Sequence, residues 1–336
     1  MASVFVAAAF AVAGTAVVWL GGGRLETASE RLGAYYGFPA VVQGAVIAAI
    51  GSSFPELSSS VIAVLLHGEF NLGVGAIVGS AIFNILVIPG VSALKGHGVD
   101  ANRDVVYKEA QFYMLAVAVL LLTFSFGVIY HPSPTGRLVA TVTRPLALIP
   151  VGLYAVYVFI QFQDVSDFEP PDVDDVDAGK QWVVLLGSLV AILVGVELLV
   201  QAALDLEALL GVPSTIWGLT VVAAGTSLPD AIVSVRAADA GRGTASLANV
   251  LGSNTFDLLV AIPAAVLLAG SAEVDFATAV PMMGFLTVAT LGFLVATRTD
   301  LELTRGEATS LLGLYVLFIA WMVTETVGIT AIVPGV

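Results

Sequence analysis

Long apolar runs separated by short polar segments recur along the whole chain. Each run covers roughly 17–25 residues, the length that an α-helix needs to cross the hydrocarbon core of a bilayer. The pattern predicts ten membrane-spanning helices, near residues 3–22, 39–66, 71–94, 109–130, 144–163, 181–204, 213–238, 244–269, 276–297 and 308–329. The first run has no basic segment in front of it and is too long for a signal peptide, so we interpret it as the first span. The expected fold class is an all-α polytopic membrane protein.

An acidic segment at residues 164–180 separates the ten predicted spans into two sets of five. Because five is an odd number, a second half that repeats the first enters the membrane in the opposite orientation. We therefore expect two inverted five-helix repeats, at residues 1–163 and 181–336. The segment between them has two interpretations, a calcium-binding loop and a solvated linker. Its Pro170-Pro171 pair and the lack of an Asp-x-Asp-x-Asp-Gly pattern favour the linker.

The distribution of basic residues tests this topology independently. The loops after the odd-numbered spans contain most of the 12 Lys and Arg residues: Arg24, Arg31, Lys95, Arg103, Lys108, Lys180, Arg236, Arg242, Arg298 and Arg305. The opposite side holds only Arg137 and Arg144. Loops on the cytoplasmic side of a membrane carry the excess of basic residues. We therefore predict a multi-pass protein of the cell membrane with both termini extracellular and the acidic linker cytoplasmic.

Composition agrees with a membrane protein and disfavours several other classes. Hydrophobic residues make up 58% of the chain and charged residues only 11%, which leaves no soluble domain of useful size. The formal net charge of −14 argues against nucleic acid as a partner. The chain contains no cysteine, so disulfides and thiolate metal sites are excluded.

Two polar motifs occur twice, each time inside apolar sequence. Their copies are GSSFPE at 51–56 with GTSLPD at 225–230, and GSAIFN at 79–84 with GSNTFD at 252–257. Glu56 and Asp230 are 174 positions apart. Asn84 and Asp257 are 173 positions apart, so one register relates both pairs. A carboxylate in hydrocarbon is costly unless it is paired or coordinates a cation, so the duplication predicts a transporter with a half-site in each repeat.

The first motif is expected to bend its helix beside an acid in both halves. Pro55 cannot donate a hydrogen bond to the carbonyl of Gly51, and its ring pushes that carbonyl aside. Pro229 is expected to do the same to Gly225. The residues expected on the faces next to the freed carbonyls are Ala49, Ser52, Ser53 and Glu56 in the first half, and Ala223, Thr226, Ser227 and Asp230 in the second.

The second motif places a serine one helical turn before a polar partner in both halves. Ser80 precedes Asn84, and Ser253 precedes Asp257, so each pair lies on one helix face. The glycine that begins each copy is expected to let neighbouring helices approach closely. Two further polar residues are candidates to support the site from behind: Gln43 and Asn254.

The pooled motif residues offer only oxygen ligands, namely three carboxylates, one amide, several hydroxyls and the freed carbonyls. Such ligands suit the hard cations sodium, potassium and calcium, whereas magnesium dehydrates reluctantly. The histidines His67, His97 and His131 fall in predicted loops and are interpreted as surface residues. Glu197 and Gln201 have no acidic counterpart in the first half, so we interpret them as helix-end anchors.

On these motifs the chain resembles the calcium/cation antiporters. The two hallmark alpha-repeats of that family correspond to residues 44–94 and 218–268, and the ten-span layout extends the resemblance over the whole chain. The resemblance implies sodium/calcium antiport by alternating access, with the first and sixth spans as the sliding elements. It also implies ion ligands at Glu56, Asn84, Asp230, Asp257, Ser52, Ser53, Ser80, Thr226, Ser227 and Ser253, completed by the carbonyls of Ala49 and Ala223.

The branch of the family is left open between three alternatives. Asp230 is similar to the potassium-dependent branch, because many prokaryotic sodium/calcium exchangers have Glu there. Glu56, Asp230 and Asp257 carry a formal charge of −3, which one calcium plus one potassium would neutralise, as would three sodium ions. The proton/calcium branch typically carries Gly-Asn-x-x-Glu in place of Gly-Ser-Ser-x-Pro-Glu, which makes proton exchange the minor alternative.

Other classes of function fit the sequence less well. Asp230 and Asp257 suggest the dyad of an intramembrane aspartyl protease, but the expected Tyr-Asp and Gly-x-Gly-Asp motifs are absent. A serine protease that used Ser52 or Ser53 would need a His or Lys base within the membrane, and the predicted spans offer none. A passive cation channel differs from an antiporter in needing no counter-ion. We expect a transporter and not an enzyme, without a cofactor, whose partners are sodium, calcium and the lipid bilayer; no protein partner is indicated.

Overall fold

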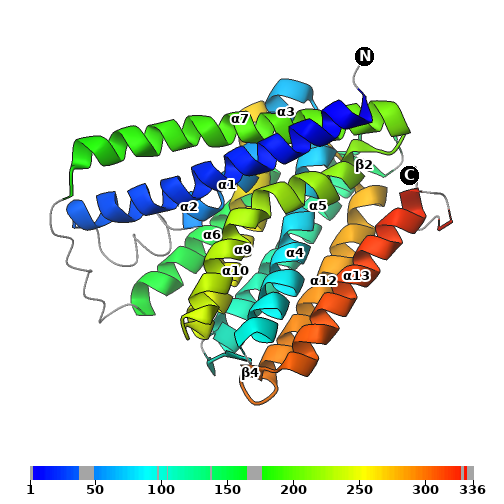
Figure 1. Ribbon diagram of the computed structural model, residues 1–336. Coiled ribbons are helices and arrows are strands. Elements are labelled where there is room, and N and C mark those ends of the chain that lie inside the picture. The colour runs from blue at the N-terminus through cyan, green and yellow to red at the C-terminus, as the bar shows by residue number, and fades with distance from the viewer. Residues whose placement is uncertain are drawn as a thin grey trace.

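Helices make up almost all of the protein in the computed structural model, which describes residues 3–37, 49–96, 98–103, 105–136, 138–164, 176–326 and 329–330 (Figure 1). The long helices are α1 (Val4–Tyr35), α4 (Phe70–Gly96), α5 (Ala110–Tyr130), α6 (Arg144–Asp164), α7 (Ala178–Leu210), α12 (Phe276–Arg298) and α13 (Arg305–Thr326). The shorter helices are α2 (Ala49–Ser52), α3 (Phe54–His67), α8 (Ser214–Trp217), α9 (Ala223–Asp239), α10 (Gly243–Phe256) and α11 (Ile262–Ala269). Three π-helical turns complete the helices: η2 (Val105–Glu109), η3 (Gly218–Val222) and η4 (Asp257–Ala261). Within these residues nine helical stretches are long and apolar enough to cross a membrane, which agrees with the predicted all-α polytopic fold.

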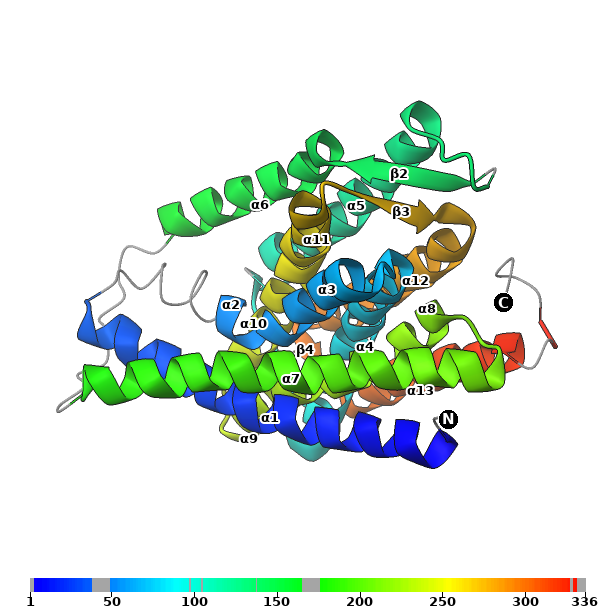
Figure 2. The ribbon, with the colours of Figure 1, turned by 90° about the horizontal axis from the view of Figure 1, so that it is seen from above.

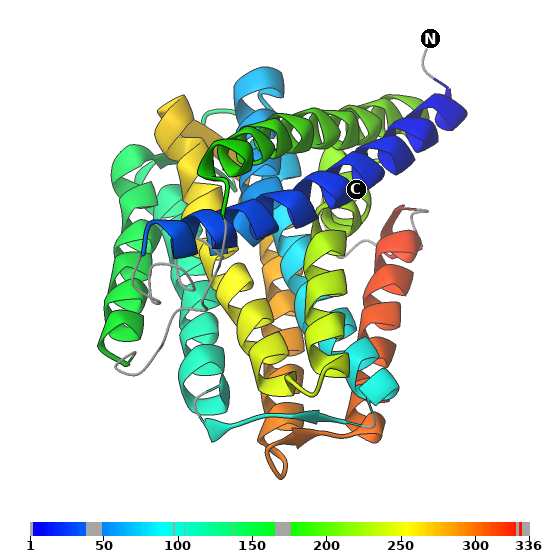
Figure 3. The ribbon, with the colours of Figure 1, turned by 60° about the vertical axis from the view of Figure 1, so that its left-hand side comes forward.

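The predicted second span, 39–66, is the crossing that these nine stretches do not include. Its residues 39–48 lie outside the described ranges, and its remainder forms α2 and α3. The first turns of α1 and the last turns of α13 lie at the same end of the bundle (Figures 1 and 3). Two ends on one side agree with the even number of crossings that the sequence predicts.

Two short antiparallel ladders join loops of the two halves. β1 (Val99–Asp100) pairs with β4 (Glu302–Leu303), and β2 (Val139–Thr143) pairs with β3 (Ser271–Asp275). Each ladder joins the loop after the third span of one half to the loop after the fourth span of the other. Because β3 and β4 flank the 23-residue α12, the ladders lie about 35 Å apart, at opposite ends of that helix. Two halves of opposite orientation produce this reciprocal pairing.

α1 and α7 pack against each other and lie obliquely across the remaining helices (Figure 2). Gly14 and Gly195 mark their crossing, because a methyl group added at Gly14 would lie 2.6 Å from the carbonyl oxygen of Gly195. α1 has 32 residues and is therefore about 48 Å long, well beyond the ~30 Å hydrocarbon core. It ends at Tyr35 and not near residue 22, because its last polar turns continue the helix past the apolar run on which the prediction rested.

The helices that carry the second motif form the centre of the bundle. In the most apolar window of α4, 83% of the residues are buried, and the stretch from α10 to α11 reaches 78%. The corresponding share is 22% in α1 and 17% in α6, which places those helices at the lipid-facing periphery. A polar side chain on α4 or α10 is therefore shielded from both lipid and water by other helices.

α4 touches the backbone of the second repeat through two glycines. A methyl group added at Gly79 would lie 2.2 Å from the carbonyl oxygen of Leu219, and one at Gly75 would lie 2.5 Å from that of Thr215. The expected close approach therefore holds for Gly79. It is wrong for Gly252, the equivalent glycine, where an added methyl would meet the hydroxyl of Tyr157 at 3.7 Å. Gly252 faces a side chain of α6, whereas Gly79 faces backbone.

Candidate ion-binding site

The first copy of the proline motif interrupts its helix at Ser53. α2 ends at Ser52, Ser53 has φ −90° and ψ 8°, and α3 begins at Phe54 with Pro55 in its first turn. The interruption lies two residues before the expected kink at Pro55, because proline is tolerated in the first turn of a helix, where no partner for its missing N–H is needed. Glu56 consequently lies in the first turn of α3, where the helix dipole favours a negative charge.

The second copy is built differently. α9 continues through Pro229 as a helix, and the irregular backbone precedes it as the π-helical turn η3, which ends directly before Ala223. A second π-helical turn, η4, begins at Asp257. Such turns interrupt the regular backbone hydrogen bonding and are frequent at functional sites. Asp257 therefore lies on irregular backbone, whereas Asp230 lies eight residues beyond η3, in a regular helix that continues through its proline.

The three motif acids come together inside the bundle from α3, α9 and η4. Glu56 is 1% exposed, Asp230 is 2% exposed and Asp257 is fully buried. The charge of Glu56 acts on both aspartates, and the charge of Asp230 acts on Asp257. Residues that are up to 201 positions apart in the sequence thus form one buried, negatively charged centre.

A hydrogen-bonded chain connects three helices at this centre. Ser227 Oγ on α9 donates to Ser80 Oγ on α4 at 2.7 Å. Ser80 Oγ lies 3.4 Å from Glu56 Oε1 and donates to it, and Asn84 Nδ2 approaches Ser80 Oγ at 3.5 Å. Ser80 therefore holds the carboxylate of one repeat next to the hydroxyl of the other.

Asn254 supports the site by fixing the amide of Asn84. Asn84 Nδ2 donates to Asn254 Oδ1 at 3.0 Å, while Asn254 Nδ2 donates to the carbonyl of Ala81 at 3.1 Å and to the hydroxyl of Tyr113 at 3.4 Å. With its nitrogen engaged, Asn84 presents a buried Oδ1 that has no hydrogen-bond partner among the described residues. Asn254 thus has the supporting position that its helix face predicted, whereas Gln43 lies outside the described residues.

Replacing Asn254 by Ala is expected to raise the calcium concentration for half-maximal transport about fivefold to tenfold. The reason is the loss of one buried hydrogen bond that orients Asn84, worth about 1 kcal/mol or slightly more. Calcium-dependent flux in proteoliposomes measures the effect. Asn249→Ala is the matched control, because Asn249 lies on the same helix and its Nδ2 donates to Ser234 Oγ at 3.2 Å, and not to a motif residue. Equal effects of the two substitutions would contradict this role.

Several buried oxygen atoms at the centre have no hydrogen-bond partner in the part of the chain that the structure describes. They are Ser53 Oγ, Glu56 Oε2, Asn84 Oδ1, Asp230 Oδ2, and Asp257 Oδ1 and Oδ2. Buried acceptors without donors are strongly unfavourable unless a cation is bound. Over the same residues no three acidic or histidine side chains form a metal-binding group by themselves. Calcium takes about 6–8 oxygen ligands, so an ion here needs the hydroxyl and amide oxygens as well.

Among the remaining predicted ligands, Ala223, Thr226 and Ser253 are buried. Thr226 Oγ1 donates to the carbonyl of Ala223 at 3.3 Å, and Ser253 Oγ donates to that of Val250 at 3.2 Å. Each hydroxyl that donates to its own helix keeps its lone pairs for a cation. Ser52 is half-buried and ends α2, which begins at Ala49.

Two interpretations outside the motifs were wrong. His67 is not a loop residue: it ends α3, and its Nε2 lies 3.1 Å from Glu197 Oε2. Glu197 lies well inside α7, which continues to Leu210, and it also accepts a hydrogen bond from Gln201 at 3.0 Å. The link joins α3 to α7, and its partners are too far apart in sequence for periodicity to have paired them.

One charged residue near the site was not singled out from the sequence. The predicted first span ends near residue 22, before Glu26. In the structure Glu26 lies within α1, and its charge acts on Asp230. Its spacing of one turn from Gly22 and from Glu30 is the helical signal that could have identified it.

Comparisons with a family profile, with individual proteins and with solved structures all match this chain to sodium/calcium exchangers. A family profile described as "Sodium/calcium exchanger protein" matches residues 6–163 and 180–324. Sodium/calcium exchanger MaX1 of Methanosarcina acetivorans is 28% identical over 312 residues, which cover 83% of this chain and 87% of that protein. Sodium/potassium/calcium exchanger 4 of Mus musculus is 49% identical over 82 residues, or 24% of this chain and 13% of that protein.

Among solved structures, the sodium-calcium exchanger NCX_Mj has the same fold. The two structures superpose with a TM-score of 0.61 at 23% sequence identity, over 95% of this chain and 99% of that one. The likeness covers 95% of this chain, so the helical arrangement is shared over nearly its whole length.

Proposed function

The chain belongs to the sodium/calcium exchanger family, and from this premise we propose that it exchanges Na⁺ for Ca²⁺ across the membrane by alternating access. Membership confirms the resemblance that the duplicated motifs indicated. A cation/calcium antiporter in this fold needs a buried oxygen site that two ions of different charge can occupy in turn. The proposal assigns that role to the centre around Glu56, Asn84, Asp230 and Asp257.

The observation that carries the proposal is the set of unpartnered oxygens at the centre. They come from α3, α4, α9 and η4, and hence from both repeats. Hydroxyls, amides and carboxylates without soft ligands suit sodium and calcium, which share similar oxygen coordination. Sodium and calcium would compete for the same oxygen atoms, because the centre offers too few of them to coordinate the sodium ions and the calcium ion at the same time.

Charge explains why transport would be an exchange and not a leak. Glu56, Asp230 and Asp257 carry a formal charge of −3 when all are ionised. Three sodium ions neutralise this charge, whereas one calcium ion leaves −1. Carrying an unneutralised charge across the low-dielectric barrier is costly. The empty centre, with its full charge of −3, is disfavoured most, so ion-loaded states cross far more readily and the movement of one ion is coupled to that of the other.

Potassium is the ion that would complete the neutralisation with calcium. One calcium and one potassium together balance −3. The local similarity to a protein named sodium/potassium/calcium exchanger supports potassium co-transport, as does Asp at position 230. This finer assignment is part of the proposal and is tested separately from sodium dependence.

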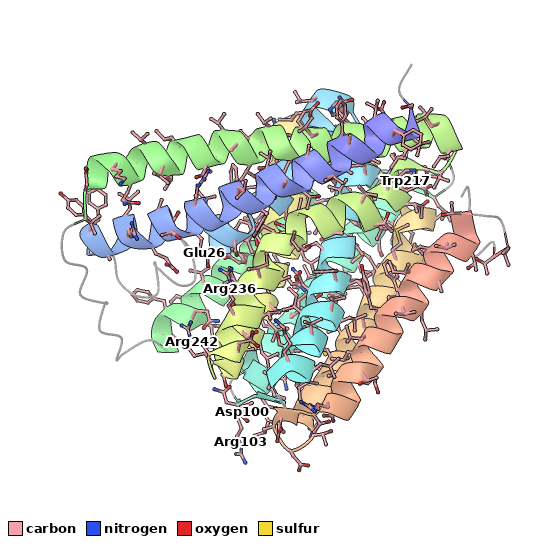
Figure 4. All side chains as sticks on the ribbon, in the orientation of Figure 1. Glu26, Asp100, Arg103, Trp217, Arg236 and Arg242 are labelled. Carbon is pink, nitrogen blue, oxygen red and sulfur yellow. The ribbon has the colours of Figure 1, made fainter. Side chains whose placement is uncertain are left out.

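The proposed orientation places both termini outside the cell. Arg103, Arg236 and Arg242 lie towards the end of the bundle that carries β4, as a comparison of Figures 1 and 4 shows. The opposite end carries Arg144, which donates to the carbonyl of Leu267 at 2.9 Å. The excess of basic side chains therefore supports a cytoplasmic position for the end with β1 and β4.

Calcium uptake into proteoliposomes preloaded with sodium tests the proposal. We expect uptake that requires internal sodium and stops when choline replaces it. If potassium travels with calcium, uptake also requires external potassium and labelled potassium enters together with calcium. Uptake that is indifferent to sodium would contradict the proposal: dependence on a pH gradient would then identify a proton exchanger, and dependence on neither would identify a channel.

A further inference from the structure

α1 passes directly beside the proline motifs of both repeats. A methyl group added at Gly22 would lie 3.2 Å from the ring of Pro229, the residue before Asp230. One turn later, a methyl group added at Gly51 would lie 3.9 Å from the Cα of Glu26 and 3.9 Å from the hydroxyl of Ser29. Gly22 and Glu26 are separated by four residues and share one helix face. Glu26 therefore lies beside both proline motifs, one helical turn beyond Gly22 in the direction of Tyr35.

Glu26 is half-buried, and its carboxylate makes no hydrogen bond or ion pair with any residue that the structure describes. Its negative charge acts on Asp230, whose Oδ2 is buried and without a partner. Glu30, one turn further along α1, is exposed and acts on Glu26 in turn. The basic Arg24 is exposed and two residues away, and so points to another side of the helix.

We propose that Glu26 is a fourth carboxylate of the transport path, which attracts cations to Asp230 from the side of the membrane on which α1 ends. It is not one of the motif ligands, and no cation needs to remain bound to it. The proposal rests on the cation exchange proposed above and adds a side-specific residue to it. The basic residues predict that this side is the cytoplasm.

Physical reasoning favours this role over a structural one. An unpaired carboxylate that is partly removed from water destabilises a helix interface unless a cation visits it. A glutamine would fill the same space between Gly22 and Gly51 without that cost. α1 also places Glu26 one turn beyond the contact of Gly22 with Pro229, in the direction of Tyr35, and hence on the side of the site on which α1 ends.

The charge dependence of the effect gives the proposal a sharp signature. The energy of a cation in the field of Glu26 is proportional to the charge of the cation. If removing that field weakens the apparent affinity for sodium by a certain factor, it therefore weakens the apparent affinity for calcium by the square of that factor. A loss of about threefold for sodium corresponds to about tenfold for calcium. Loss of a helix contact would show no such relation.

The test measures half-saturating calcium and sodium concentrations on each side of oriented proteoliposomes that contain the full chain. Three variants are compared with the unchanged protein: Glu26→Gln, Glu26→Asp and Glu30→Gln. Glu26→Gln is expected to weaken calcium about tenfold and sodium about threefold on the side where α1 ends, with little change on the other side. Glu26→Asp keeps the charge and is expected to retain most of the affinity, and Glu30→Gln serves as the exposed control.

The outcomes separate this inference from the function on which it rests. If the unchanged protein moves calcium without dependence on sodium, the proposed function fails and this inference falls with it. If exchange is intact but Glu26→Gln behaves like Glu30→Gln, this inference alone is overturned. Equal losses on both sides, or equal factors for sodium and calcium, would also overturn it, because they indicate a packing defect.

Discussion

Replacing Glu56 by Gln is expected to abolish sodium-dependent calcium uptake, lowering its rate at least about a hundredfold. The substitution keeps the size of the side chain and the contact with Ser80, but it removes one of three carboxylates from a centre where each acts on the others. Removing one partner from a buried charged site costs about 3 kcal/mol or more, which is the size of a hundredfold loss. Initial rates of labelled calcium uptake into sodium-loaded proteoliposomes measure the effect.

Asp230→Asn should have the same result, and Asp239→Asn provides its control. Asp239 is the last residue of the same helix. It is exposed, and its Oδ2 lies 3.6 Å from Lys95 Nζ. Its replacement should leave transport within about twofold of the original, since an exposed ion pair contributes at most about 1 kcal/mol. Both motif variants should express and fold, because losing a buried charge without a bound cation is not destabilising. Full exchange in Glu56→Gln or Asp230→Asn would refute the assignment of the site.

Replacing Gly79 by Ala is expected to destabilise the protein by about 3 kcal/mol and to lower its melting temperature in detergent by about 10 °C. The added methyl group would lie 2.2 Å from the carbonyl oxygen of Leu219 and 2.7 Å from its Cα, and both are backbone atoms that cannot rotate away. α4 and η3 would have to separate, and with them Ser80 and Ser227. Thermal unfolding and the yield of monodisperse protein measure the loss.

Gly252→Ala is the matched control for this substitution. Gly252 begins the equivalent motif in the second repeat, but an added methyl group would meet only the hydroxyl of Tyr157, at the ordinary contact distance of 3.7 Å. Alanine is also the better helix former, by up to about 1 kcal/mol. We expect the melting temperature of Gly252→Ala to be unchanged or slightly raised. If both variants lost the same stability, the contact between α4 and η3 would not be the cause.

The burial and clustering of the three motif acids is the part of the site that sequence reasoning anticipated best. Glu56, Asp230 and Asp257 were singled out because an acid in an apolar run needs a cation or a partner, and the structure buries all three together. Helical spacing also placed Ser80 and Asn84 on one face, and they lie within hydrogen-bonding reach. These inferences rest on local periodicity, which each helix expresses wherever it packs.

Features that depend on two distant segments were missed or wrong. His67 and Glu197 are 130 positions apart, and nothing in either segment predicts their contact. The equivalence of Gly79 and Gly252 in the motif concealed the fact that one faces backbone and the other a side chain. One further difference is local: Ser53, and not Pro55, interrupts the first helix, because a proline is tolerated in the first turn of a helix.

The number of spans, the two-repeat plan and the identity of the buried acids follow from the amino-acid order, since hydrophobic length and duplicated motifs are local properties of the chain. The meeting of the acids from both repeats, the orientation of Asn84 by Asn254 and the position of Glu26 follow only from packing. The physical reason is that two inverted halves cross at α4 and η3, and the backbone contacts at that crossing select which side chains share the same buried space.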